Sequence, residues 1–338
     1  MHKTASLEGL PRIGFSLGPL LSIGQVLEFA RLANQKQNVD SLWIPESWGR
    51  EAYSTLGALT QATTRVRLGT SIINIYSRTP ATVAMAAITL DALSGNRTIL
   101  GLGSSTPAIV NNWHGQRFEN PIGRMKEYIE VLRLMLSGQR VNYDGIYFKV
   151  KGFKILHDPP RKNVPIFVAA VNKKMLNLAS SLADGTLLYL RPFEEMKMTV
   201  KVIKSSIKKN SAIDRRFEII TIFITSVSNK EPEKARERAA KTLAFYVAVG
   251  EYYNRFLSAN GFKNEVEIIT EGYRKNGLDS IDKLVPDKML NSLAVYGTSE
   301  ECAKSIKKFL STGITMPVLQ VNPVPDAEGS IREMLSTF

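Results

Sequence analysis

Eight apolar runs of strand length alternate along this chain with amphipathic stretches of helix length. The strand-length runs cover residues 12–18, 41–46, 67–74, 97–103, 165–170, 185–190, 217–227 and 316–321. This alternation is typical of parallel strands joined by helical crossovers. Eight repeats within 338 residues favour an α/β fold of the (β/α)8 TIM-barrel class over a doubly wound sheet. We expect a single domain over residues 1–338.

Two segments interrupt the repeat. Residues 139–158, after the fourth strand, alternate and carry Tyr143-Asp144-Gly145, which predicts an antiparallel hairpin. Residues 231–290, after the seventh strand, are rich in helical patterns and contain no clear strand. We therefore expect a barrel with insertions after strands four and seven. Whether residues 264–287 close over the site as a lid stays open.

Composition limits the kinds of partner. The formal net charge is +13, but Lys and Arg are scattered over presumed helix faces, which predicts solubility rather than a nucleic-acid surface. The single cysteine, Cys302, excludes an intrachain disulfide and a cysteine metal cage. His2, His114 and His157 are too separated for a metal cluster, so no metal is expected.

The chain also lacks the features of exported, membrane and serine-hydrolase proteins. No stretch approaches the ~20 apolar residues of a membrane span, and residues 1–10 have no apolar leader pattern. We expect a soluble, cytoplasmic protein. A Gly-x-Ser-x-Gly motif is absent, and no Ser/His/Asp set can be assembled from strand ends, which disfavours that route of hydrolysis.

Polar and small residues follow the third and fourth predicted strands. In a TIM barrel the ligand site lies at the carboxyl ends of the strands. Gly103 lets the backbone approach a flat ring closely, and Ser104, Ser105 and Thr106 supply hydroxyls beside it. A simple strand-end turn is the other interpretation. A dinucleotide fingerprint is rejected because the third glycine and the following acidic residue are missing.

Two further strand ends carry charged candidates. Glu46 ends the second strand, where it could serve as a proton acceptor or donor, or as a helix-capping or salt-bridging carboxylate. Val171, Asn172 and Lys173 open a helix after the fifth strand, and Arg191 ends the sixth. Such groups can hold a phosphate. A plain N-cap with solvated lysines is equally compatible with the pattern.

Taken in order, these motifs resemble the bacterial luciferase-like superfamily, in its branch of oxidoreductases that use the deazaflavin coenzyme F420. The resemblance is carried by Gly69-Thr70-Ser71-Ile72 with Arg78 and Pro80, Asn96-Arg97, Tyr143-Asp144-Gly145, Ala183-Asp184-Gly185 and Tyr296-Gly297-Thr298. It implies a TIM barrel, usually a homodimer, with a cis peptide bond at Ser71-Ile72 against the central ring of the deazaflavin. The implied cofactor contacts are Glu46, Ser71, Ile72, Asn74, Ser104, Ser105 and Thr106, with phosphate contacts near Val171, Asn172, Lys173 and Arg191.

The resemblance also implies a reaction, namely hydride transfer between the deazaflavin C5 and a small organic substrate. The F420-dependent glucose-6-phosphate dehydrogenases pair an acidic residue with a histidine after strand two and carry a glutamate after strand four. Here Glu46, Ser47 and Thr106 stand at those places. The chain therefore looks more like methylenetetrahydromethanopterin reductase, with Glu46 as the catalytic acid-base candidate.

Two alternatives remain. The first is an FMN-dependent monooxygenase of the same superfamily, because the barrel and its loops are shared. The second is a barrel that binds a cofactor or metabolite without catalysis, since one acidic candidate gives little support for chemistry. The substrate and the direction of hydride transfer are not fixed by the sequence.

Overall fold

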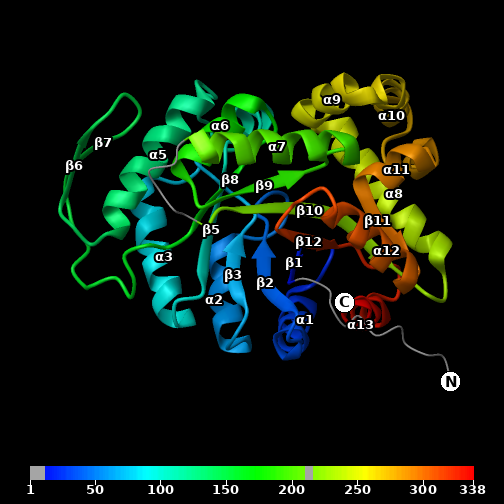
Figure 1. Ribbon diagram of the computed structural model, residues 1–338, viewed down its shortest axis with the longest axis horizontal. Helices are drawn as coiled ribbons and strands as arrows, with labels where there is room; N and C mark the ends of the chain where they lie inside the picture. Colours follow the sequence, from blue (N-terminus) through cyan, green and yellow to red (C-terminus); the bar gives the residue numbers. More distant parts are fainter. Residues whose placement is uncertain (1–11, 210–215) are drawn as a thin grey trace. The chain divides into compact units, whose positions relative to one another are not determined.

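The computed structural model describes residues 12–209 and 216–338, so the expectation for residues 1–10 lies outside it. The contacts divide the chain into two compact units. Unit 1 contains Met1–Asp40, Leu188–Val202 and Ile219–Phe338, and unit 2 contains Ser41–Leu187 and Ile203–Glu218. Figure 1 shows the elements of both units coloured along the sequence. The single domain expected from the sequence stays a prediction.

Unit 2 is built on parallel strands that pair in the order in which they occur along the chain. The order is β2 (Val39–Ile44), β3 (Arg67–Thr70), β5 (Thr98–Gly103), β8 (Ile166–Ala169) and β9 (Gly185–Tyr189), with β4 (Ile73–Asn74) also pairing with β5. Its helices are α2 (Ala52–Ala62), α3 (Pro80–Ser94), α4 (Pro107–Asn112), α5 (Pro121–Leu136) and α6 (Lys173–Leu182). This strand–helix alternation is the one predicted from the sequence, with the short helix α4 in addition.

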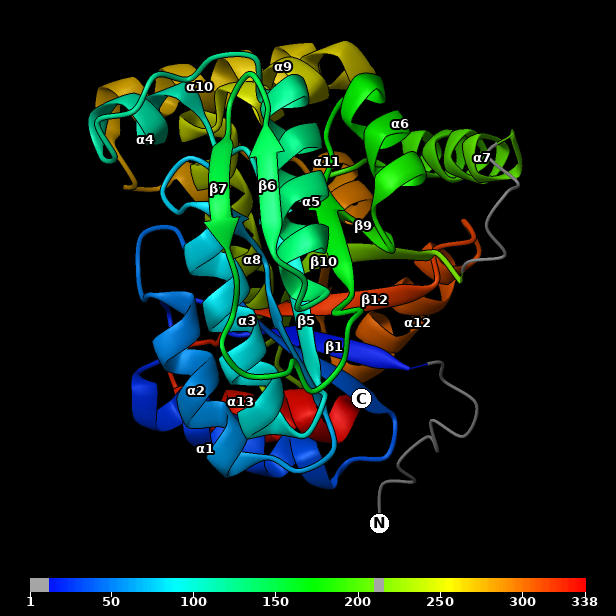
Figure 2. The same ribbon diagram turned by 90° about the vertical axis from the view of Figure 1, so that its left-hand side faces the viewer.

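The predicted hairpin is confirmed in unit 2. Strands β6 (Val141–Asp144) and β7 (Lys149–Phe153) are antiparallel and lie beside α5, as Figure 2 shows. Glu127 of α5 holds the turn, because its carboxylate accepts hydrogen bonds from the backbone N–H groups of Ile146, Tyr147 and Phe148 at 2.9, 2.8 and 3.2 Å. The hairpin is therefore fixed to the helix at its turn.

Unit 1 contains parallel strands in the order β11 (Ala294–Gly297), β10 (Glu218–Val227), β12 (Met316–Val321) and β1 (Ile13–Ser16). Its helical elements are α1 (Ile23–Gln35), α8 (Pro232–Val249), α9 (Glu251–Leu257), η1 (Ser258–Phe262), α10 (Lys263–Asn276), η2 (Ile281–Leu284), α11 (Asp287–Leu293), α12 (Ser299–Leu310) and α13 (Ala327–Thr337). Helix α7 (Phe193–Lys209) begins in unit 1 and ends in unit 2.

Every long strand was predicted from the sequence, and one short strand was not. Strand β11 has four residues and pairs with the last part of β10, from Ile224 to Val227. So short a run gives a weak pattern, and its conformation depends on the neighbouring strand. The predicted helical insertion is present as α8 to α11, which pack together in one apolar cluster with Ile224 of β10.

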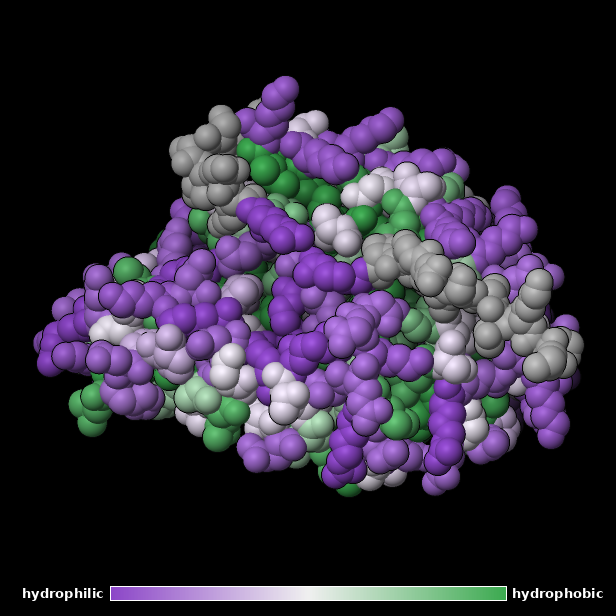
Figure 3. Space-filling view, turned by 60° about the horizontal axis from the view of Figure 1, so that its bottom comes forward, coloured by the Kyte–Doolittle hydropathy of each residue, from purple (hydrophilic) through white to green (hydrophobic). Residues whose placement is uncertain are grey.

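The surface agrees with the expected spread of polar residues. On the face drawn in Figure 3, hydrophilic side chains are scattered over the surface, with apolar side chains showing between them. Among the described residues, no helix is both long enough and apolar enough to span a bilayer.

Candidate functional site

The strand ends of unit 2 approach one another closely. Thr70 of β3 donates its hydroxyl to the carbonyl of Gly101 at 2.9 Å and accepts from the N–H of the same residue at 2.8 Å. A Cβ on Gly101 would stand 1.9 Å from the Thr70 carbonyl oxygen, and one on Gly103 would stand 2.6 Å from the Ile72 side chain. These two glycines are therefore required by packing within the protein, and a cofactor contact of Gly103 stays a prediction.

The backbone between β3 and β4 has the conformation implied by the resemblance. The Ser71-Ile72 peptide bond is cis, as predicted. On one side, the Ser71 N–H donates to the carbonyl of Ile44 at the end of β2 at 3.0 Å. On the other side, the N–H of Ile75 donates to the carbonyl of Gly103 at 3.0 Å. Hydrogen bonds to two neighbouring strands thus fix the segment that carries Ser71, Ile72 and Asn74.

Asn74 provides the test of whether a cofactor fits here. Its side chain is 4% exposed, and its Oδ1 accepts a hydrogen bond from the N–H of Tyr76 at 2.9 Å. Its Nδ2 is buried and has no hydrogen-bond partner among the described residues. Leaving such a donor unsatisfied costs about 1–3 kcal/mol, so a missing acceptor is expected. A ring that carries carbonyl oxygens at its edge, as a deazaflavin does, fits this requirement.

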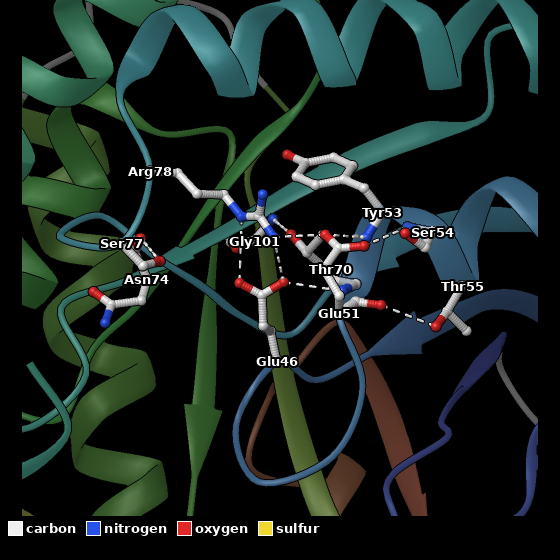
Figure 4. Close-up of polar contacts among 11 residues, drawn as sticks. Glu46, Glu51, Tyr53, Ser54, Thr55, Thr70, Asn74, Ser77, Arg78 and Gly101 are labelled. Atoms are coloured by element: carbon white, nitrogen blue, oxygen red, sulfur yellow. Dashed lines mark hydrogen bonds and ion pairs between the residues drawn. The ribbon is translucent and has the colours of Figure 1, made fainter. Parts of the chain in front are cut away.

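Glu46 is part of an ion cluster rather than an isolated carboxylate. Figure 4 shows Glu46 and Glu51 converging on Arg78. Arg78 donates to both oxygens of Glu46, at 2.9 Å from Nη2 and 3.3 Å from Nε, and to Glu51 at 2.6 Å. The backbone N–H of Ala52 donates to Glu46 at 2.9 Å. The salt-bridging interpretation of Glu46 is therefore confirmed.

The cluster holds the loop between β2 and α2 against the residues before α3. Glu51 caps α2 by accepting from the N–H groups of Tyr53 and Ser54 at 3.0 and 2.6 Å. Burial acts against the charged form of Glu51, but these hydrogen bonds and Arg78 outweigh it and lower the pKa of this carboxyl. Burial and the two glutamates act in opposite directions on Arg78, and the net result is a raised pKa. Both partners stay charged at neutral pH.

The remaining predicted residues of unit 2 lie at helix starts. Thr106 caps α4, accepting from the N–H of Ile109 at 3.4 Å, and Ser105 just before it has a left-handed φ of 59°. Asn172 caps α6, accepting from the N–H of Met175 at 3.0 Å, and Lys173 is exposed. The simple N-cap interpretation of Asn172 is confirmed, and a phosphate contact of Val171, Asn172 or Lys173 stays a prediction.

Arg191 belongs to unit 1 and already has internal partners. Its side chain is 2% exposed and donates to Glu195 at 2.5 Å and to Thr199 at 2.8 Å, and it lies over the Phe256 ring at 4.5 Å. Burial lowers the pKa of Arg191 despite Glu195. Because a carboxylate neutralises this guanidinium, its contacts do not support the second phosphate-binding cation that we expected from the sequence.

The ion cluster around Glu46 was not predicted from the sequence. Arg78 appeared only within the family motif, and Glu51 and Tyr53 were not selected at all. The N-cap position of Glu51, directly before an apolar helical run, was a local signal that could have been used. The pairing of Arg78 with Glu46 had no local signal, because 32 residues separate them.

Known proteins resemble this chain over most of its length. The family model described as "Luciferase-like monooxygenase" matches residues 10–316. The 5,10-methylenetetrahydromethanopterin reductase of Archaeoglobus fulgidus is 28% identical over 327 residues, which cover 95% of this chain and 96% of that protein.

Two solved structures share the fold. The coenzyme F420-dependent tetrahydromethanopterin reductase of Methanopyrus kandleri matches with a TM-score of 0.84 at 22% identity, over 97% of this chain and 98% of that one. An F420-dependent secondary alcohol dehydrogenase, solved with an F420-acetone adduct, matches with a TM-score of 0.79 at 21% identity, over 98% of each chain. The TIM barrel expected from the sequence is thus confirmed. The chain belongs to the luciferase-like monooxygenase family.

Proposed function

We propose that this protein is an F420-dependent oxidoreductase that transfers a hydride between the deazaflavin C5 and a small organic substrate. Two kinds of relative support this proposal. The Archaeoglobus fulgidus protein that aligns with nearly the whole chain is a 5,10-methylenetetrahydromethanopterin reductase, which supports the class of reaction, and the two matched structures are F420-dependent enzymes, which supports the cofactor. The single observation within this chain that carries the proposal is the buried Asn74 Nδ2, which has no hydrogen-bond partner in the described part of the chain.

The protein's own residues would bind and orient the ring. Asn74 would donate to an acceptor at the ring edge, and Ser104 and Ser105, which are half-buried after β5, would offer hydroxyls to its polar groups. When bound, the deazaflavin supplies the hydride chemistry. The remaining task of the chain is to fix the substrate and to exclude water.

We assign Glu46 a positioning role within this proposal. Both of its oxygens accept hydrogen bonds from Arg78, and one also accepts from Ala52. A substrate would have to displace these donors before it could exchange a proton with Glu46. The contacts therefore support a carboxylate that orders the loop after β2, in place of the catalytic acid-base suggested by the sequence.

Cofactor titration tests the proposal. We expect the purified protein to bind F420 in preference to FMN. Binding is measured by the quenching of cofactor fluorescence. Asn74→Asp keeps the acceptor for the Tyr76 N–H but replaces the unsatisfied donor, and it should weaken F420 binding by roughly tenfold or more. Asn177→Asp, at an exposed position of α6, is the charge-matched control and should bind as wild type does. Equal binding by the Asn74 variant would remove the observation on which the proposal depends.

FMN is the second candidate cofactor. The matching family model is described by a monooxygenase activity, and the barrel is common to both kinds of enzyme. Preferential binding of FMN in the same titration, with oxygen-dependent turnover, would establish this alternative. Binding of F420 without reduction or oxidation by any substrate tested would favour the non-catalytic barrel. The homodimer and the cytoplasmic location expected from the sequence stay predictions.

A further inference from the structure

Arg124, the fourth residue of α5, is a partly buried cation to which the site described above gives no role. The Cζ of its guanidinium lies over two aromatic rings, 4.7 Å from the centroid of Tyr76 and 5.0 Å from that of Phe148. Tyr76 is itself stacked on Phe118, with centroids 5.3 Å apart, and its hydroxyl donates to the carbonyl of Glu119 at 2.8 Å. The guanidinium is therefore held in place by rings that are fixed themselves.

The guanidinium of Arg124 has no hydrogen-bond acceptor in the described part of the chain. Its Nε is buried and unsatisfied, and its two Nη groups form no hydrogen bond or ion pair there. The two rings attract the positive charge, but they do not supply the oxygen acceptors that the five N–H donors of an arginine require. Leaving a buried donor unsatisfied costs about 1–3 kcal/mol. An acceptor is therefore missing at this position.

Other partly buried arginines of unit 2 show what such a side chain normally obtains. Each of them donates to a carboxylate or carbonyl oxygen, and Arg78 donates to two carboxylates. The residues in this comparison are Arg67, Arg78, Arg97, Arg133 and Arg161. Arg124 differs from them because none of the described acidic residues forms an ion pair with it.

Arg124 lies beside the residues proposed to bind the cofactor ring. Tyr76, whose ring it covers, donates its backbone N–H to the Oδ1 of Asn74 at 2.9 Å. Asn74 is the last residue of β4, and its Nδ2 is the buried donor on which the proposed function depends. Substrate contacts in TIM-barrel enzymes come from the carboxyl ends of the strands and the loops that follow them. Arg124 therefore belongs to the rim of the candidate site.

The chemistry of a guanidinium defines the group that is missing. Arginine stays charged at physiological pH, and its planar fork matches the paired oxygens of a carboxylate or a phosphate. A water molecule or a neutral alcohol can accept a hydrogen bond, but neither balances the charge. An oxyanion does both, and the attraction is stronger at a partly buried position than in bulk water.

We propose that Arg124 binds an oxyanion group of the substrate, a carboxylate or a phosphate, and that it makes the protein selective for acidic substrates. The inference rests on the proposed function, because it assigns the oxyanion to the molecule that exchanges the hydride. The rings of Tyr76 and Phe148 orient the guanidinium before the substrate arrives, which reduces the entropy lost on binding. Phe148 belongs to the hairpin turn that Glu127 fixes, so the hairpin contributes to specificity through this ring.

Anion binding to the full-length protein tests the inference without turnover. The probes are succinate and inorganic phosphate, and succinamide is the uncharged control. Each is titrated at constant ionic strength, with and without F420. The readout is the assigned NMR signal of the Arg124 Nε–H group. We expect an anion to shift this signal saturably and succinamide to leave it unchanged, because a neutral amide does not balance the charge.

Two variants separate the planar fork from charge alone. Arg124→Lys keeps the charge but loses the fork, so its affinity for the anion, measured by calorimetry, should fall by about tenfold. Arg117→Lys is the matched control, since the Arg117 side chain is 90% exposed, and it should bind the anion as wild type does. Circular dichroism checks the folding of both variants. The wild-type titration decides the inference by itself if Arg124→Lys does not fold.

The outcomes separate this inference from the proposed function. Anion binding that persists with F420 bound and weakens only in Arg124→Lys supports the inference. No shift with either anion in a wild-type protein that binds F420 overturns the inference and leaves the proposed function intact. An equal shift with succinamide, or equal weakening in Arg117→Lys, also overturns it.

The same experiment distinguishes the substrate from the cofactor as the source of the oxyanion. Competition between the anions and F420, or weaker F420 binding by Arg124→Lys, would assign Arg124 to the phosphate of the cofactor and overturn the inference. A protein that binds the anions but not F420 would overturn the proposed function and, with it, the substrate role of Arg124.

Discussion

Glu46→Gln tests the positioning role assigned to the ion cluster of Glu46, Glu51 and Arg78. The amide keeps one oxygen, which can accept from the Ala52 N–H. Its NH2 group would face an Arg78 donor, so at least one of the Arg78 contacts at 2.9 and 3.3 Å is lost. Glu51 remains within 2.6 Å of Arg78, so the guanidinium keeps a counter-charge. We therefore expect a moderate loss of stability and not unfolding.

The magnitude follows from the number and exposure of these contacts. A hydrogen bond to a charged group contributes about 1.5–3 kcal/mol net. The side chains of Glu46 and Arg78 are 19% and 22% exposed, so solvent screens part of the interaction. We expect a loss of about 1–2 kcal/mol in the free energy of unfolding. For a chain of this size that corresponds to a fall in Tm of roughly 1–3 °C.

The assay combines unfolding with turnover. Urea and thermal unfolding followed by circular dichroism give the stability, and F420 reduction or oxidation with a substrate found by screening gives the rate. A positioning residue predicts the stability loss and a fall in turnover below about tenfold, whereas loss of a general acid costs about 10²–10⁴-fold. Glu194→Gln, in the exposed pair with Lys197, is the control and should change neither quantity. Wild-type stability with turnover reduced beyond a hundredfold would refute our reasoning and restore Glu46 as the acid-base.

Two further predictions concern packing and the hairpin. Gly101→Ala should destabilise the protein by about 2 kcal/mol or more, because its Cβ would stand 1.9 Å from the Thr70 carbonyl oxygen. Gly57→Ala within α2, where nothing lies within 4 Å, should stabilise by about 0.5–1 kcal/mol, and similar effects of the two changes on urea unfolding would contradict the packing argument. Glu127→Leu should increase amide hydrogen exchange at residues 146–148, because the N–H groups of these residues donate hydrogen bonds to the Glu127 carboxylate. Burial acts to raise the pKa of Glu127, but those three bonds outweigh it and leave the pKa lowered, so the wild-type hairpin should keep its protection until the pH falls below the usual range of a glutamate. A hairpin that is equally protected in the Leu variant would show that Glu127 does not hold it.

Much of the fold could be predicted because parallel β-α repeats leave a strong local pattern. Each long strand is a run of mostly buried, apolar residues. The hairpin was predicted from the alternation of apolar and polar residues around Tyr143-Asp144-Gly145. The cis bond at Ser71-Ile72 was also predicted, but only through the family resemblance. Strand β11 was missed, since four residues carry too little pattern to reveal a pairing with β10.

The candidate site was predictable only in part, since strand ends are local features and their partners are not. Ser104, Ser105 and Thr106 follow β5 as expected. The role of Glu46, however, depends on Arg78, which lies 32 residues later, and Arg124 lies over the ring of Tyr76, which comes much earlier in the chain. Neither pairing has a sequence signal, because either residue alone fits many environments.

The sequence by itself determined the order of strands and helices and which residues stand at strand ends, because hydrophobic periodicity is set by neighbours along the chain. Only the tertiary structure decided which polar groups are satisfied. It paired Glu46 with Arg78 and Arg191 with Glu195, and it left the Nδ2 of Asn74 buried without a partner among the described residues. Hydrogen bonding and burial are properties of the surrounding space, which residues distant in the sequence create together.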